Sequence, residues 1–268
     1  MRGKLQKKDT TVSDLIEGFL GKTVEGKKSR LPAKLDFLQS ATGLFLGLFM
    51  WGHMFFVSTI LISDDAMYKV ARFFEGSMLF DKPKPGLVSI VVGFVFIVFM
   101  VHAAMGLRKL PANFRQWQIY RTHMKMMKHD ETNMWFIQAV TGFAMFFLGS
   151  AHLFLMLTQP GTIGPFGSGD RMLTLWPFYL MLLFAVELHG SIGLYRLCIK
   201  WGWFEGEDAK KTRVTLRKVK WAITVFFLVL GLTTLLAYLK IGMNHSDNAG
   251  ERYAPSAMII DMNVGVKS

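Results

Sequence analysis

Hydrophobic residues are concentrated in five long stretches of this chain, and polar, charged segments separate them. The stretches cover residues 38–62, 87–107, 134–157, 173–199 and 221–239. Each holds about 20 residues or more, which is enough for an α-helix to cross a hydrocarbon layer of about 30 Å. The pattern therefore predicts an all-α membrane protein with five transmembrane helices, and the histidines within them indicate that four of these helices form a cofactor-binding bundle.

The polar ends divide the chain into three predicted parts. We expect a basic N-terminal segment over 1–37, a transmembrane domain over 38–240 and a polar tail over 241–268. The N-terminal segment lacks the apolar run of a cleavable signal peptide, so the first hydrophobic stretch is expected to direct membrane insertion. The connections between stretches are too short to fold as a separate soluble domain.

Positive charge is distributed unevenly between the polar segments, and this distribution predicts the membrane topology. The chain has 31 Lys and Arg residues and a net charge of +12. Most of them, 23 of the 31, lie on one side: before the first stretch, between the second and third, or at the end of the fourth and before the fifth. The positive-inside rule then predicts a cytoplasmic N-terminus and an extracytoplasmic C-terminus. Because topology explains the charge, nucleic-acid binding is not expected, whereas contact with lipid or a partner protein is.

Four histidines lie within the first four stretches, one in each: His53, His102, His152 and His189. A histidine in hydrocarbon is costly and usually serves a function. Because successive helices alternate in direction, we expect His53 and His152 near the outer side and His102 and His189 near the inner side. Two layers of two imidazoles are what two haem groups with paired axial ligands require.

A short internal repeat divides the histidines in the same way. Four residues recur at a constant offset of 99 positions: Gln39, Thr42, Gly43 and His53 match Gln138, Thr141, Gly142 and His152. Small residues also follow His102 and His189, and they would let a flat macrocycle or a neighbouring backbone approach closely.

The four histidines also admit uses apart from haem ligation. A zinc site or a proton relay would normally add Cys, Asp or Glu in the same layer, and Glu187 is the one clearly intramembrane acid. A histidine-lined transporter and a structural anchor without ligands are the remaining classes. The single cysteine, Cys198, excludes an internal disulfide, and the sequence contains no CxxCH motif for covalent haem attachment.

Five longer motifs carry a resemblance to a known family. They are KKSRLPAKLDFLQSATGLFLGLFMWGHMFFVSTIL, VHAAMGLRKLPANFRQW, QAVTGFAMFFLGSAHLFLMLTQP, LLFAVELHGSIGLYRL and KWGWFEGE, and the similarity covers about residues 27–240. These motifs resemble the cytochrome b subunits of the quinol:fumarate reductase and succinate dehydrogenase family, in the dihaem, five-helix form found in epsilonproteobacteria.

The resemblance implies a function and a set of partners. His53 and His152 would bind an outer haem b, and His102 and His189 an inner one. The chain would oxidise menaquinol in the bacterial inner membrane and have no dicarboxylate active site of its own. A flavoprotein subunit with FAD and an iron–sulfur subunit would bind its cytoplasmic face, in a dimer of heterotrimers. A succinate:menaquinone reductase anchor, or a hydrogenase or formate dehydrogenase anchor, is the alternative.

Two acidic residues are candidates for proton transfer. Glu75 lies in the outer connection 63–86, where an acid is ordinarily solvated; the resemblance implies that it accepts the hydroxyl proton of menaquinol. Glu187 precedes His189 by two residues, about 200° around the helix, so it is not expected to be a ligand on the same face. It is either a buried, protonated acid or, as the resemblance implies, a proton conductor that accompanies haem reduction.

Several polar residues at the helix ends are candidates for binding the haem propionates. On the inner side the resemblance implies this role for Gln39, Ser40, Lys109, Trp135 and Lys200, although each is also an ordinary interface residue. Arg171, at the outer start of the fourth stretch, is expected either to pair with a propionate or proton-path group or to extend toward the lipid headgroups.

Overall fold

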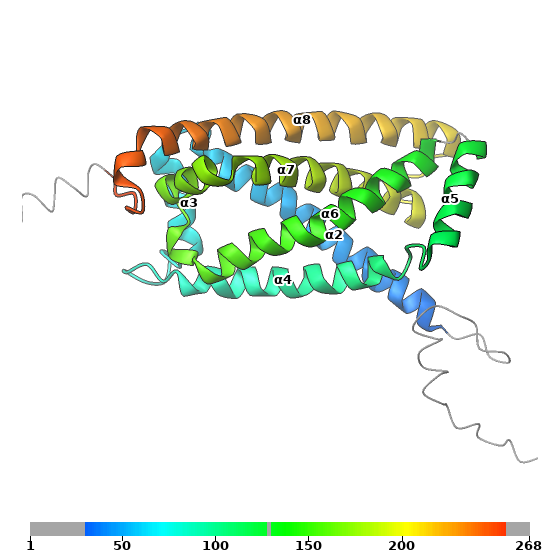
Figure 1. Ribbon diagram of the computed structural model, residues 1–268, viewed down its shortest axis with the longest axis horizontal. Coiled ribbons are helices and arrows are strands. Elements are labelled where there is room, and N and C mark those ends of the chain that lie inside the picture. Colours follow the sequence, from blue (N-terminus) through cyan, green and yellow to red (C-terminus); the bar gives the residue numbers. More distant parts are fainter. Residues whose placement is uncertain (1–29, 128–129, 256–268) are drawn as a thin grey trace, which may run out of the picture.

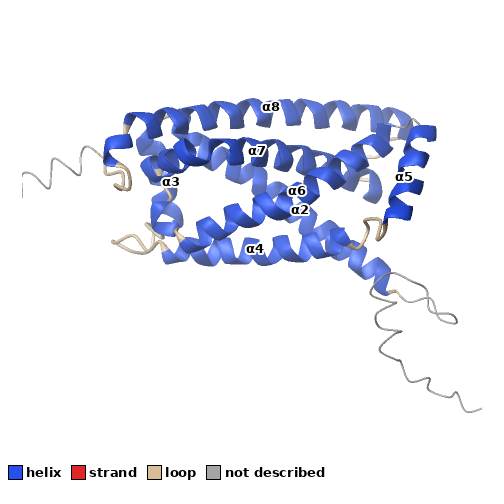
Figure 2. Cartoon of the chain, viewed as in Figure 1, coloured by secondary structure: helices blue, strands red, loops and turns tan. Residues whose placement is uncertain are grey.

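The computed structural model describes residues 30–127 and 130–255, which form a helical bundle (Figure 1). The described residues contain helices and loops but no strand (Figure 2). The α-helices are α2 (Leu31–Ser58), α3 (Asp64–Phe74), α4 (Gly86–Leu107), α5 (Phe114–Met127), α6 (Asp130–Thr158), α7 (Pro165–Trp201) and α8 (Ala209–Asn244). Short 3-10 turns follow α2, α6 and α8: η1 (Thr59–Leu61), η2 (Pro160–Thr162) and η3 (Ser246–Asn248).

Five helices among the described residues are long and apolar enough to cross a membrane: α2 with η1, α4, α6, α7 and α8. This confirms the predicted all-α class and the five spans. Large apolar side chains face outward along α4, where Ile90, Phe94 and Ile97 are each more than half exposed. Such a surface suits lipid, because the helices satisfy their own backbone polar groups.

The helices are longer than the apolar stretches that predicted them. α7 covers Pro165–Trp201 where 173–199 was predicted, and α8 covers Ala209–Asn244 where 221–239 was predicted. Hydropathy detects only the apolar part of a helix, whereas backbone hydrogen bonding continues into polar residues. At the start of α8, for example, the Asp208 side chain accepts hydrogen bonds from the backbone N–H groups of Lys210 and Lys211.

Four helices form a closed ring in which α2 contacts α4, α4 contacts α6, α6 contacts α7 and α7 returns to α2. α8 lies outside this ring and packs along α7 and, less extensively, α2 (Figure 1). Small residues allow the close contact of α7 with α8: a Cβ atom added to Gly169 would lie 2.8 Å from the Gly242 backbone nitrogen. The ring is the predicted four-helix bundle, and it encloses the candidate site.

The two ends of the bundle differ. α5 lies at the end where α2 begins and α4 and α7 finish, and we call this the α5 end; α3 lies at the opposite, α3 end (Figure 1). The helix α3 was not predicted, because its segment was treated as a polar connection. Ser63 caps it by accepting a hydrogen bond from the Ala66 N–H, and Met67 and Ala71 bury its apolar face. Residues 1–29 and 256–268, and with them most of the predicted N-terminal segment and the end of the tail, lie outside the described residues.

Candidate functional site

A cavity of about 1240 Å³ lies inside the ring of α2, α4, α6 and α7, with further wall residues from α3 and α8. Ordinary ligand pockets measure about 300–1,000 Å³, so this cavity has room for a large group or more than one. The structure brings together on its wall every predicted site residue except Glu187: Gln39, Ser40, His53, Glu75, His102, Lys109, Trp135, His152, Arg171, His189 and Lys200.

The four histidines face one another in the predicted pairs. The ring centroids of His53 and His152 are 6.1 Å apart with an interplanar angle of 80°. Those of His102 and His189 are 6.2 Å apart at 89°. Two metal–nitrogen bonds of about 2 Å each, together with the ring radii, span about 6 Å, so each pair is spaced to hold one metal ion between its rings. The residues thus fit the axial ligation of two haem groups.

Hydrogen bonds orient the pair nearer the α5 end. His189 Nδ1 lies 2.9 Å from the Gln138 carbonyl oxygen, so Nδ1–H donates to it. His102 Nδ1 lies 3.2 Å from Thr42 Oγ1, whose own hydrogen is directed to the Leu38 carbonyl. Both bonds engage Nδ1 and leave Nε2 available to bind a metal, which is the usual arrangement for a ligand histidine.

The glycines of the internal repeat explain how close these rings lie to the neighbouring helices. A Cβ atom on Gly43 of α2 would lie 2.9 Å from His102 Cε1, and one on Gly142 of α6 would lie 2.7 Å from His189 Cε1. The small repeat residues therefore admit the imidazole of a facing helix. Each copy of the repeat contributes to both histidine pairs. Its glycine packs against His102 or His189, and its own histidine, His53 or His152, belongs to the other pair.

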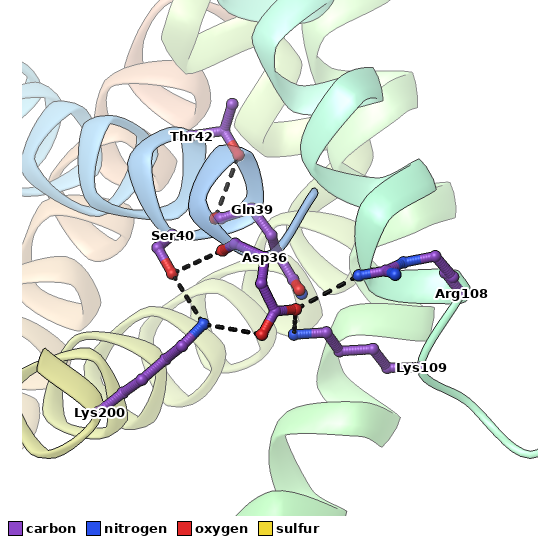
Figure 3. A network of polar contacts seen from close by, with 7 residues as sticks. All are labelled: Asp36, Gln39, Ser40, Thr42, Arg108, Lys109 and Lys200. Carbon is purple, nitrogen blue, oxygen red and sulfur yellow. Dashed lines mark hydrogen bonds and ion pairs between the residues drawn. The ribbon is translucent and has the colours of Figure 1, made fainter. Parts of the chain in front are cut away.

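At the α5 end of the cavity, three basic side chains surround Asp36 and form a cationic group (Figure 3). The Asp36 carboxylate contacts Lys109 Nζ at 2.5 Å, Lys200 Nζ at 3.1 Å and Arg108 Nη2 at 3.3 Å. Lys200 also donates to Ser40 Oγ at 3.3 Å. Sequence reasoning singled out both lysines but missed Asp36, whose only signal is a carboxylate near the start of a mostly apolar helix.

Gln39 and the charges at this end restrict what could bind there. Gln39 Oε1 is buried and has no hydrogen-bond partner among the described residues; as an amide oxygen it accepts, so it would need a donor, and only the Nε2 group of the same side chain could donate to a carboxylate. The balance of charge, in contrast, fits a bound acidic group. The cations of Lys109 and Lys200 outnumber the single charge of Asp36. Trp135 lies on the same wall, with its ring 4.6 Å from that of Tyr120 on α5.

Arg171 belongs to the opposite end of the cavity. Its Nη1 donates to the Thr162 carbonyl at 3.1 Å and to Thr162 Oγ1 at 2.5 Å, and its Nη2 donates to Ser168 Oγ at 3.1 Å. The guanidinium is thus bonded to the protein and borders the cavity. These contacts favour the expectation that places Arg171 at the cavity over the one that extends it toward the lipid headgroups.

Glu75 is buried rather than solvated, which corrects the expectation for an acid in a polar connection. It ends α3 and is 1% exposed, and it borders the cavity at the α3 end. Arg72 Nη1 lies 3.2 Å from its Oε2, and Arg252 Nη2 contacts its Oε1. Arg252 was missed because nothing near it in the sequence marks it, and its partner is 177 positions away.

Glu187 lies apart from these residues. It is 1% exposed and absent from the cavity wall that His189 joins, as its angular offset from that histidine predicted. Its Oε1 has no hydrogen-bond partner within the described ranges. No group of three or more His, Cys, Asp or Glu side chains is placed to hold a metal among the described residues.

Comparison with known proteins assigns the chain to a family. Residues 112–230 match the family described as Succinate dehydrogenase/Fumarate reductase transmembrane subunit. The chain is 56% identical over 239 residues to the fumarate reductase cytochrome b subunit of Wolinella succinogenes, covering 88% of this chain and 93% of the relative. It is 57% identical over 237 residues to that of Helicobacter pylori J99, covering 88% and 91%. Taken with the five apolar helices and the paired histidines, these similarities show that the chain belongs to the family of fumarate reductase cytochrome b subunits.

Proposed function

We propose that this chain is the dihaem, menaquinol-oxidising membrane subunit of a fumarate reductase complex. The observation that carries the proposal is the pair of imidazole–imidazole spacings, 6.1 Å and 6.2 Å, on the wall of one cavity. His53 and His152 would hold one haem b, and His102 and His189 the other. When bound, the two haems supply one-electron carriers between a quinol and the partner subunits.

Residues at the two ends of the cavity would bind the acidic edges of these groups. Lys109 and Lys200 would supply positive charge at the α5 end, and Gln39, Ser40 and Trp135 would supply hydrogen-bond donors there. Arg171 would act at the α3 end. Charge-assisted hydrogen bonds to carboxylates are roughly twice as strong as neutral ones, so these contacts would fix the orientation of each group.

Glu75 would act as the base that accepts the hydroxyl proton of menaquinol at the α3 end. It is buried and borders the cavity, where its carboxylate oxygens would be the acceptors for the proton of a bound hydroxyl group. Glu187 would conduct a proton that accompanies electron transfer. Moving one charge against 100 mV costs about 2.3 kcal/mol, so such compensation has a driving force.

The orientation of the chain in the membrane would be set by its basic residues. The α5 end, with Lys109, Lys200 and the other basic residues of its connections, would face the cytoplasm of the bacterial inner membrane, and the α3 end would face the periplasm. The flavoprotein subunit with FAD and the iron–sulfur subunit would bind at the α5 end. Segment 1–37 would then be cytoplasmic and tail 241–268 periplasmic. Two such heterotrimers would associate as a dimer.

A redox cycle of the assembled complex tests this function. Adding a reduced naphthoquinol should produce the absorption bands of reduced b-type haem, and adding fumarate afterwards should remove them. A spectrum that responds to dithionite but to neither quinol nor fumarate would contradict the proposal, because the haems would then be disconnected from both substrates.

A glycine substitution tests the placement of the haem nearer the α5 end. Gly142→Ala places a Cβ atom 2.7 Å from His189 Cε1, so the ring must shift away from the position in which it would hold a haem. We expect purified Gly142→Ala to lose one of the two haem b signals in a spectroscopic redox titration. Gly86→Ala, at the start of α4, is the matched control, because nothing lies within 4 Å of its added Cβ atom and Gly86 is not on the cavity wall. Equal haem content in both variants would contradict the placement.

A further inference from the structure

The last described segment of the chain, residues 249–255, returns to the α3 end and is tied to the bundle there. It follows η3 beyond the end of α8. The Gly250 N–H donates to Asp170 Oδ2 at 3.0 Å, and the Tyr253 hydroxyl donates to Asp65 Oδ1 at 2.6 Å. Since Asp170 belongs to α7 and Asp65 to α3, the segment links two helices that border the cavity.

Aromatic contacts hold the same segment. The Tyr253 ring centroid lies 5.7 Å from that of Tyr68 on α3 and 5.0 Å from that of Phe166 on α7. Burial, and then the hydrogen bond to Asp65, raises the pKa of Tyr253 to about 12. Like any tyrosine, Tyr253 is protonated at neutral pH, and its hydroxyl can donate to Asp65. The segment 249–255 is therefore held by four separate contacts with α3 and α7.

Arg252 lies in the middle of this segment and reaches Glu75. Both oxygens of the Glu75 carboxylate are engaged, Oε2 by Arg72 of α3 and Oε1 by Arg252 of the segment. Glu75 is 1% exposed, whereas Arg252 is 41% exposed and borders solvent. A buried carboxylate needs such partners, because an unpaired charge is strongly disfavoured away from water.

We propose that Arg252 is a positioning residue for the quinol site, acting through Glu75 to hold its carboxylate at the cavity wall. The inference rests on the proposed function of Glu75 as the base. Arg72 comes from the same helix and restrains one oxygen only, so Arg252 supplies the second restraint, from outside. Each oxygen has about two lone pairs, so two arginine contacts leave acceptor positions for a quinol hydroxyl.

The test uses the assembled complex in membranes with variants Arg252→Gln and Arg252→Lys. Lys82→Gln is the matched control, because it removes a positive charge from the exposed segment after α3. We measure kcat and KM for a soluble naphthoquinol, fumarate reduction from a low-potential artificial donor that bypasses the quinol, and the haem spectrum. Arg252→Gln should lower kcat about 10-fold, the scale of one charge-assisted hydrogen bond, and leave KM within about twofold.

The other measurements separate positioning from a structural effect. Arg252→Lys should recover most of the lost kcat, and Lys82→Gln should behave as wild type. Artificial-donor activity and the haem spectrum should be unchanged in every variant. Tyr253→Phe, which removes the hydrogen bond to Asp65, should lower kcat in the same direction by a smaller factor, and it serves if Arg252→Gln fails to assemble.

Three results would overturn the inference: wild-type kcat in Arg252→Gln, an Arg252→Lys variant as slow as Arg252→Gln, or an equal loss in Lys82→Gln. The variant Glu75→Gln shows whether a negative result concerns the role of Arg252 or the role of Glu75 as the base. If Glu75→Gln is inactive with quinol while Arg252→Gln is normal, only the role of Arg252 is wrong. If Glu75→Gln retains quinol oxidation, the base itself is wrongly assigned.

Discussion

Replacing His102 by Ala should remove one haem and leave the other in place. His102 and His189 form a pair at 6.2 Å, and His53 and His152 form a separate pair at 6.1 Å. Without His102 only His189 would remain to hold the haem of that pair, whereas His53 and His152 would still hold the other. A spectroscopic redox titration of the purified complex should then show one component instead of two, and quinol-dependent fumarate reduction should fall to background because the electron path is interrupted.

His123→Ala is the matched control for that substitution. His123 is exposed on α5, outside the ring of helices, and contributes nothing to the cavity wall. Both titration components should survive its removal. If His102→Ala retains both components, or if His123→Ala loses one, the assignment of ligands to the cavity histidines is wrong.

Glu75→Gln should abolish most menaquinol oxidation without disturbing either haem. The substitution keeps the size of the side chain and removes its capacity to take up a proton. Loss of a general base lowers rates by about 10²–10⁴-fold, and we expect a decrease in that range for quinol-dependent fumarate reduction. Activity with an artificial donor that reduces the partner subunits directly should persist, since that route does not use the α3 end.

Asp81→Asn is a suitable control for Glu75→Gln. Asp81 is an exposed acid in the segment that follows α3, and it does not border the cavity. Its loss should reduce quinol oxidation far less. Equal losses in the two variants would indicate a general charge effect at the α3 end and would argue against a specific base.

The features that local pattern determines were predictable from the sequence. Apolar length located the five spans, and alternating helix direction paired His53 with His152 and His102 with His189, as the ring distances show. Both inferences need only the rise of an α-helix and a membrane of known thickness. The helix ends were underestimated because polar residues continue the helices beyond their apolar parts.

Features that depend on long-range contact were not predictable. Asp36 becomes the centre of a cationic group only because α2, α4 and α7 meet at the α5 end (Figure 3). Glu75 is buried because α3 folds against the ring, and Arg252 reaches it across 177 positions. No periodicity or motif in the sequence encodes these neighbours, since each depends on how separate helices pack.

The central claim is that two imidazole pairs each hold one haem, and the haem content of the purified chain tests it most directly. Haem extracted from the protein and divided by the amount of polypeptide should give two b-type haems for each copy. A value of one would show that one histidine pair serves another purpose. A haem-free chain that retains its fold would contradict the claim for both pairs.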